Sequence, residues 1–154
     1  MTRTNRKIII LIVVVILVTA FVFSNSLKNS QESHKDSGAI VRLVESIVDA
    51  IFPNNTFDLN YIVRKGAHLF EFFVLGVVVM LLLLQVKNEK INKVVLACLY
   101  VIGIALTDEF IQSFNDRTSS FVDVLIDTSG GLIGIGLILL LCFIKRSKTK
   151  TRQA

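Results

Sequence analysis

Ionisable side chains interrupt the apolar stretches of this sequence, at spacings that could serve acid–base chemistry or bind a charged ligand. The stretch at 64–84 (RKGAHLFEFFVLGVVVMLLLL) contains His68 and Glu71, which are three residues apart and therefore share one face of a helix. Asp108 and Glu109 follow a second apolar run. Histidine and carboxylates act as general acids and bases, and together they can also bind a divalent metal. These four residues are the candidates for catalysis.

Further polar residues extend this pattern. Gln112 lies four residues after Asp108, and Asp127 lies four residues after Asp123, so each pair shares a helix face. Within a membrane span, a carboxylate that faces lipid is costly, and such groups normally face the interior of a helix bundle or a water-filled cavity. The sequence therefore predicts that these side chains meet in a shared polar pocket.

Four long apolar runs must position these residues. Hydrophobic residues make up 53% of the 154-residue chain, which is too many, and too clustered, for an ordinary soluble domain. Backbone groups inside a bilayer must be hydrogen-bonded within the protein, so each run is expected to be a helix. We predict a single all-α integral membrane domain, a bundle of four transmembrane helices at about 8–25, 62–86, 94–114 and 121–144.

The first of these runs could be cleaved, and the third is short for a membrane span. The first follows three basic residues and could also be a signal peptide cleaved near Ser24–Ser26, but its length and the three later runs favour an uncleaved span. The third is apolar only as far as Leu106, so its helix must continue through 107–114 to reach the length of a span. Its carboxylates then lie at membrane depth.

The segment between the first and second spans has a different character. Over about 37–52, apolar residues recur at helical spacing from Ile40 to Ile51, with polar residues on the opposite face. This pattern predicts an external amphipathic helix that lies in the membrane interface or covers the mouth of the bundle.

Basic residues predict the orientation in the cell membrane. They gather in both terminal tails and between the second and third spans, whereas Arg117 is the only basic residue between the third and fourth. Because short cytoplasmic flanks are enriched in Lys and Arg, both termini are expected in the cytoplasm. This topology accounts for the net charge of +5. No basic stripe is interleaved with aromatic residues, so no nucleic-acid binding is expected.

The depth of each polar residue follows from counting along its own span. At ~1.5 Å per residue, His68, Gln112 and four of the carboxylates lie ~22–28 Å from the cytoplasmic end, near the far side of a hydrocarbon core of ~30 Å. Three spans thus bring ionisable groups to one level. Lys65, Arg117 and Asp123 lie about one helical turn further from the cytoplasm. The predicted outward-facing ligand-binding pocket comprises Lys65, His68, Glu71, Asp108, Glu109, Gln112, Arg117, Asp123 and Asp127.

Small residues follow this level on the fourth span. Gly130 and Gly134 have the small-xxx-small spacing that lets a neighbouring helix approach closely. They are expected to pack the turn that carries Asp127 against the second or third span.

The same residues resemble the VanZ-like family of bacterial membrane proteins over about Lys65 to Gly134. The resemblance rests on Lys65, His68 and Glu71, and on a second block made of Asp108, Glu109, Gln112, Arg117, Asp123, Asp127, Gly130 and Gly134. Asp127 departs from the Asn that the family usually has, and Asn115–Asp116 from its common Pro-Gly turn. The resemblance implies a place in the cell envelope and lowered susceptibility to teicoplanin and related lipoglycopeptides. It defines no molecular activity.

Three functions remain open from these residues. In the first, the pocket binds a lipid headgroup, a lipid-linked envelope precursor or an amphiphilic drug, with Lys65 and Arg117 contacting phosphate or carboxylate and the acidic residues contacting cations, amines or hydroxyls. In the second, the protein is an intramembrane enzyme that modifies an envelope lipid by acid–base or metal-dependent chemistry. No HExxH motif is present and no cofactor is expected, although a divalent metal stays open. The third, an ion-coupled transporter, is disfavoured by the apolar inner halves of the spans, and oligomerisation stays open.

Overall fold

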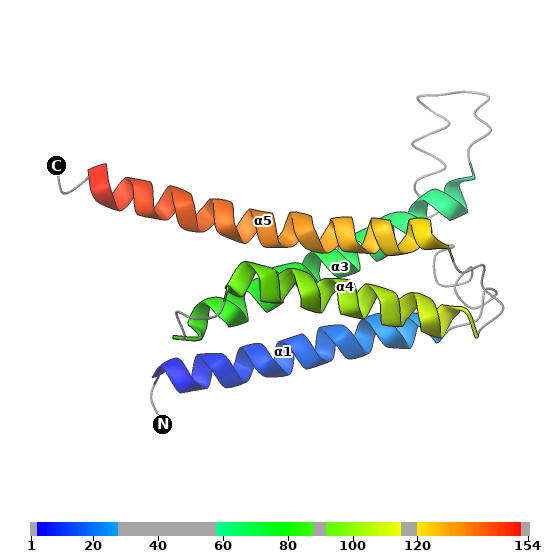
Figure 1. The fold of residues 1–154 in the computed structure, drawn as a ribbon, viewed down its shortest axis with the longest axis horizontal. Helices are drawn as coiled ribbons and strands as arrows, with labels where there is room; N and C mark the ends of the chain where they lie inside the picture. Colours follow the sequence, from blue (N-terminus) through cyan, green and yellow to red (C-terminus); the bar gives the residue numbers. More distant parts are fainter. Residues whose placement is uncertain (1–2, 28–57, 88–91, 115–119, 152–154) are drawn as a thin grey trace.

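A computed structural model describes residues 3–27, 58–87, 92–114 and 120–151 of the chain. These residues form four long helices and contain no strand: α1 (Arg3–Ser26), α3 (Leu59–Gln85), α4 (Lys93–Gln112) and α5 (Phe121–Thr151) (Figure 1). Each helix is long and apolar enough to cross a membrane. The prediction of an all-α fold with four spans is therefore confirmed. The external helix predicted at about 37–52 lies outside the described residues.

Polar side chains cap the starts of three helices. Asp58 accepts a hydrogen bond from the backbone N–H of Tyr61 at 3.1 Å, and Asn92 accepts one from Val95 at 3.3 Å. The hydroxyl of Ser120 accepts one from the backbone N–H two residues later at 3.2 Å. These bonds satisfy donors that the first turn of a helix leaves without partners. Because capping sets the boundary, α3 begins three residues before the span expected from hydropathy alone.

The other end of α5 also differs from the span expected from hydropathy. This helix continues to Thr151, beyond the apolar run that ends near Ile144, and includes Lys145, Arg146 and Lys148. A helix that leaves the hydrocarbon core no longer needs apolar residues, because its side chains there meet water and lipid headgroups instead of acyl chains. The span boundary and the helix boundary are therefore separate features of α5.

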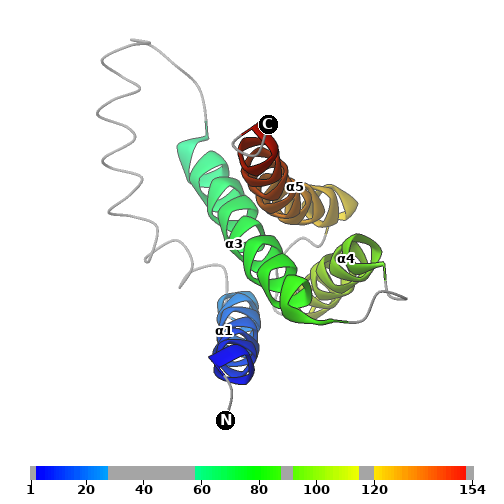
Figure 2. The same ribbon diagram turned by 90° about the vertical axis from the view of Figure 1, so that its left-hand side faces the viewer.

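The helices run alternately up and down, with α3 at the centre of the packing. Helix α3 contacts α1, α4 and α5, and its most extensive contact is with α5. Figure 2 shows α3 crossing between α1 and α5. The end of α1, the start of α3, the end of α4 and the start of α5 lie together on the right of Figure 1. We call this end of the bundle the Ser26 end.

An apolar core occupies the middle of the bundle, and apolar residues also cover its outer surface. The core includes Phe72, Leu75 and Met80 of α3, which pack against small residues of α4 such as Ala97 and Ala105. Large exposed hydrophobic residues occur on all four helices, for example Leu17, Phe70, Leu99 and Leu140. Such a surface would be unfavourable in water but is the expected one for helices surrounded by acyl chains.

Glycines let α5 approach the backbone of α3. A Cβ atom placed on Gly130 would overlap with the carbonyl oxygen of Leu69, and one on Gly134 would overlap with that of Phe73. A Cβ on Gly76 of α3 would likewise overlap with the backbone of α5. Close backbone approach through small residues is a main source of helix association in membranes, where lipid removes the hydrophobic drive.

We therefore predict that Gly134→Ala destabilises the protein while Gly136→Ala does not. A methyl group at 134 must push the two helices apart, which typically costs about 1–3 kcal/mol. A Cβ on Gly136 meets nothing within 4 Å, and alanine is the better helix former there by about 1 kcal/mol. Thermal unfolding of both variants in detergent checks this. Equal unfolding temperatures would show that the close approach of α5 to α3 contributes nothing to stability.

Candidate functional site

Five carboxylates and a histidine gather at the Ser26 end. Asp108 and Asp127 are almost completely buried, at 0% and 1% exposure, and Glu109 is buried as well. The carboxylates of Glu71, Asp108, Glu109 and Asp123 all lie close enough to Asp127 to interact with it electrostatically. We call this group the acidic cluster; it consists of His68, Glu71, Asp108, Glu109, Asp123 and Asp127.

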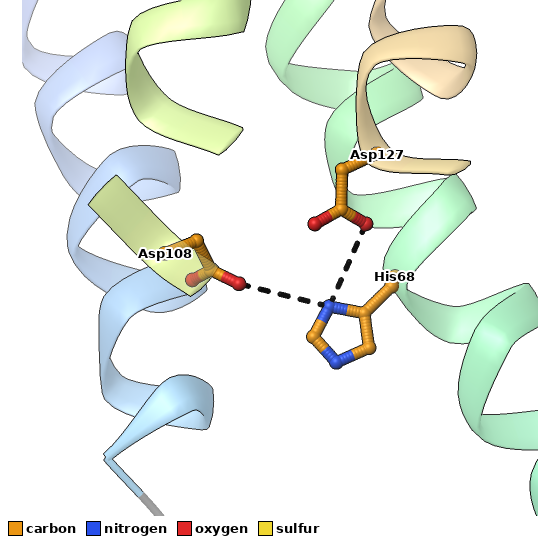
Figure 3. A group of neighbouring side chains, drawn as sticks. All are labelled: His68, Asp108 and Asp127. Carbon is orange, nitrogen blue, oxygen red and sulfur yellow. Dashed lines mark ion pairs between the residues drawn. The ribbon is translucent and has the colours of Figure 1, made fainter. Parts of the chain in front are cut away.

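At its centre, His68 of α3 lies between aspartates of α4 and α5 (Figure 3). Its Nδ1 atom is 4.0 Å from Oδ2 of Asp108 and 3.8 Å from Oδ1 of Asp127. Both distances exceed the ~3.2 Å limit of a direct N–H···O hydrogen bond. The three side chains nevertheless point toward one another, and one ligand-type atom of each lies within 4.8 Å of the others.

Donors from two helices hold Asp108 in place. The hydroxyl of Ser26, at the end of α1, donates to Oδ1, and Nε2 of Gln112 donates to Oδ2 at 2.6 Å. Gln112 is one turn further along α4, as the i, i+4 spacing requires. A buried carboxylate is stable only when such donors replace its lost water, so these bonds also fix the direction in which Asp108 points.

Glu109 links the end of α4 to the start of α5. Its Oε1 atom accepts a hydrogen bond from the backbone N–H of Ser120 at 2.5 Å, which satisfies a donor next to the start of α5. Its Oε2 atom is buried and accepts no hydrogen bond from the described residues. One oxygen of Glu109 therefore has a structural partner, while the other stays available to a ligand.

Glu71 is held from α1. The side-chain amide of Asn25 donates to Oε1 of Glu71 at 2.8 Å. Asn25 and Ser26 were not among the predicted site residues, because a short polar run after an apolar one also fits a cleavage site. The count of residues along the span could have found them: measured from Lys7, they lie ~27–29 Å along α1, at the level of the cluster. All four described helices therefore contribute to the site.

Lys65 is engaged by the protein itself. Its ammonium group forms an ion pair with Asp123, and the two side chains are only 15% and 14% exposed. The same group lies 5.1 Å from the centre of the Tyr61 ring, a favourable cation–π distance. The carboxylate of Asp123 thus competes with the predicted binding of phosphate by Lys65. Arg117 lies outside the described residues.

The formal charges of the described cluster do not balance. Among the described residues, five carboxylates lie near one ammonium group, that of Lys65, with His68 between two of them. Buried carboxylates are costly unless donors, protons or cations offset their charge. The site is therefore chemically suited to a ligand that brings positive charge or hydrogen-bond donors.

An apolar groove lies beside the cluster, between α1 and α3. It has a volume of about 310 Å³ and is lined by Leu17, Val18, Phe21, Phe70, Glu71 and Val74. Glu71 is its single polar lining residue, so the groove adjoins the cluster through this side chain. Its volume is at the lower end of the range for pockets that hold small ligands, ~300–1,000 Å³.

The contacts of α1 predict that the first span stays attached to the mature protein. Besides the two hydrogen bonds to the cluster, Thr19 of α1 bonds to the hydroxyl of Tyr100 at 3.0 Å. Removal of α1 would leave Glu71 and Asp108 without these donors. The intact mass of the protein purified from membranes should therefore include residues up to Ser26. A mass that corresponds to cleavage near Ser24–Ser26 would contradict this.

The Lys65–Asp123 pair predicts coupled effects on stability. Lys65→Met and Asp123→Leu should each lower the unfolding temperature, because either one leaves a charge without its partner; for a fully buried pair this costs roughly 3–5 kcal/mol. The double variant should lose less than the sum of the two single losses, since it removes both charges. Thermal unfolding in detergent checks the cycle, and strictly additive losses would show that the pair does not interact.

Similarity to known proteins is limited to a family match. No curated protein and no solved structure matches the chain. A model of the family described as VanZ/LLP1 matches residues 9–143, which include the whole of α3 and α4, most of α1 and α5, and every residue of the acidic cluster. The chain therefore belongs to the VanZ/LLP1 family of proteins.

Proposed function

We propose that this protein acts in the bacterial cell envelope by holding the polar end of a membrane amphiphile in the acidic cluster. Through this binding it contributes to lowered susceptibility to teicoplanin-type lipoglycopeptides. The observation that carries the proposal is the convergence of buried carboxylates and His68 from three helices on one point. Lipid-exposed charge is costly, and an intramembrane cluster of this kind is more than helix packing requires.

The carboxylates of the cluster favour an amphiphile whose headgroup carries hydrogen-bond donors. Carboxylates accept hydrogen bonds from amines and hydroxyls, and the described excess of negative charge favours a ligand that carries such donors. Oε2 of Glu109 is a buried oxygen that accepts no hydrogen bond from the described residues. A lipid headgroup, a lipid-linked wall precursor or the drug itself can supply these donors.

The groove between α1 and α3 supports an amphiphile rather than a water-soluble ligand. Apart from Glu71, its lining is apolar, as an acyl chain requires. A chain that lies in the groove places its headgroup next to Glu71 and thus next to the cluster. We place the Ser26 end on the outer side of the membrane, because the basic residues of the two tails favour the opposite side.

An enzyme that acts on an envelope lipid is the second candidate. One observation favours it: the ring of His68 lies between two buried aspartates, an arrangement that suits proton transfer. Incubation of the purified protein with a lipid extract of its host distinguishes the two candidates. A new lipid species in the mass spectrum, absent with a His68→Ala variant that inserts normally, would favour catalysis over binding.

The proposal predicts that Glu71→Gln lowers teicoplanin resistance. Glutamine can still accept the hydrogen bond from Asn25, so the fold is retained, but the charge offered to the ligand is lost. Loss of a charge-assisted hydrogen bond costs about 1.5–3 kcal/mol, which is tenfold or more in affinity. The inhibitory concentration of teicoplanin should therefore fall toward that of a strain without the protein.

Asp58→Asn is the matched control. It makes the same kind of change at an exposed carboxylate, and asparagine caps the start of α3 as well as aspartate does. Its strain should keep full resistance at equal protein levels. The binding role of the cluster would be refuted if Glu71→Gln and Asp58→Asn strains were both as resistant as the wild type.

A further inference from the structure

We propose that His68, Asp108 and Asp127 form a binding site for one divalent transition-metal ion, with Zn²⁺ or Mn²⁺ as the fitting ions. The site takes Nδ1 of the histidine and one carboxylate oxygen from each aspartate (Figure 3). The inference concerns the ion alone. It does not depend on the amphiphile of the proposed function, and it can be tested without one.

The distances between these three ligand atoms fit coordination of a shared ion better than direct hydrogen bonds between the side chains. Nδ1 of His68 is 3.8 Å from Oδ1 of Asp127 and 4.0 Å from Oδ2 of Asp108, too far for hydrogen bonds. Ligands that each lie ~2.0–2.2 Å from one zinc ion are separated by at most about 4.4 Å. Both distances fall within this limit, whereas the bound for the whole set, 4.8 Å, exceeds it, so the ligands must move slightly closer around a bound ion. That movement falls to Asp127, whose Oδ1 atom accepts no hydrogen bond from the described residues.

A buried oxygen provides independent support. Asp127 is 1% exposed, and its Oδ1 atom accepts no hydrogen bond from the described residues. In Figure 3 this atom points at the imidazole, into the space between the three side chains. A buried carboxylate oxygen that lacks donors costs free energy. A cation in that space removes this cost, whereas a ligand bound elsewhere does not.

The surroundings of Asp108 resemble the support that metal ligands need. Ser26 donates to one oxygen, and Gln112 donates to the other at 2.6 Å, so the side chain is held before any ion binds. Ligating carboxylates are generally hydrogen-bonded in this way, and the bonds set their orientation. Asp108 reaches the ion from α4, while His68 and Asp127 reach it from α3 and α5. Each of the three helices supplies one ligand, and their packing fixes the geometry.

Charge and ligand type indicate which ion fits. Two aspartates and a neutral imidazole carry a charge that a divalent ion cancels, and the neighbouring carboxylates Glu71 and Glu109 add to the attraction. Imidazole favours zinc and other transition metals, whereas sites made of oxygen alone favour Mg²⁺ and Ca²⁺. Three protein ligands also leave a position open, as in catalytic zinc sites. Zn²⁺ or Mn²⁺ should therefore bind in preference to Mg²⁺.

Metal titration of the purified protein in detergent tests the site. The protein is freed of any oligohistidine tag, stripped with a chelator and titrated with Zn²⁺, Mn²⁺ and Mg²⁺ by calorimetry. We expect one Zn²⁺ or Mn²⁺ per chain, weaker binding of Mg²⁺, and a rise in the unfolding temperature with the bound ion, because the ion binds only the native state. Failure of the wild-type protein to bind one transition-metal ion would overturn the proposal.

Asp127→Asn is the decisive variant, because it keeps the shape of the side chain and removes one charged ligand. Its affinity should fall by more than tenfold, and its unfolding temperature should no longer rise with the ion. Asp58→Asn, an equal change at an exposed carboxylate that caps the start of α3 and is not a member of the cluster, should bind as the wild type does. Unchanged affinity in Asp127→Asn would also overturn the proposal. The two proposals can fail separately. If the purified protein binds the ion but the Glu71→Gln strain keeps its drug susceptibility unchanged, the binding of an amphiphile is refuted and the metal site is not.

Discussion

The cost of burying carboxylates governs the Ser26 end of the bundle. Four of the five acidic residues there are held by partners from another part of the bundle: Asp108 by Ser26 of α1, Glu71 by Asn25 of α1, Asp123 by Lys65 of α3, and Glu109 by the backbone of Ser120 next to α5. Because a buried charge is tolerated only with such partners, each carboxylate also joins two helices. The contacts that position the carboxylates of the site are therefore also the contacts that hold the helices together at this end of the protein.

The middle of the bundle is held together by apolar packing instead of by buried charges. Glycines of α5 lie against carbonyl groups of α3, and small residues of α4 face the large side chains of the core. This packing is apolar and depends on shape, since lipid gives no hydrophobic drive for association. It holds α3 and α5 in close contact one or two turns from Asp127 and His68. The precise approach of two helices thus determines the distance between two residues of the acidic cluster.

Much of this arrangement can be predicted from the sequence, for identifiable reasons. Apolar runs predict four helices, and counting along each one places His68, Glu71, Asp108 and Asp127 at one level. The pairing of Lys65 with Asp123 could not be predicted, because it depends on how α3 and α5 are rotated about their axes. Asn25 and Ser26 were missed for another reason: their sequence context fits two interpretations, and only tertiary contacts distinguish them.

The groove between α1 and α3 has a consequence for how any occupant arrives. Leu17, Phe21 and Phe70, which line it, are also exposed on the outer surface of the bundle. In a membrane, that surface faces the acyl chains of one leaflet, so the groove is open sideways to lipid. A molecule already dissolved in the leaflet can enter by lateral diffusion and never has to cross water. Its concentration in the leaflet, rather than its concentration in water, then sets how often Glu71 meets it.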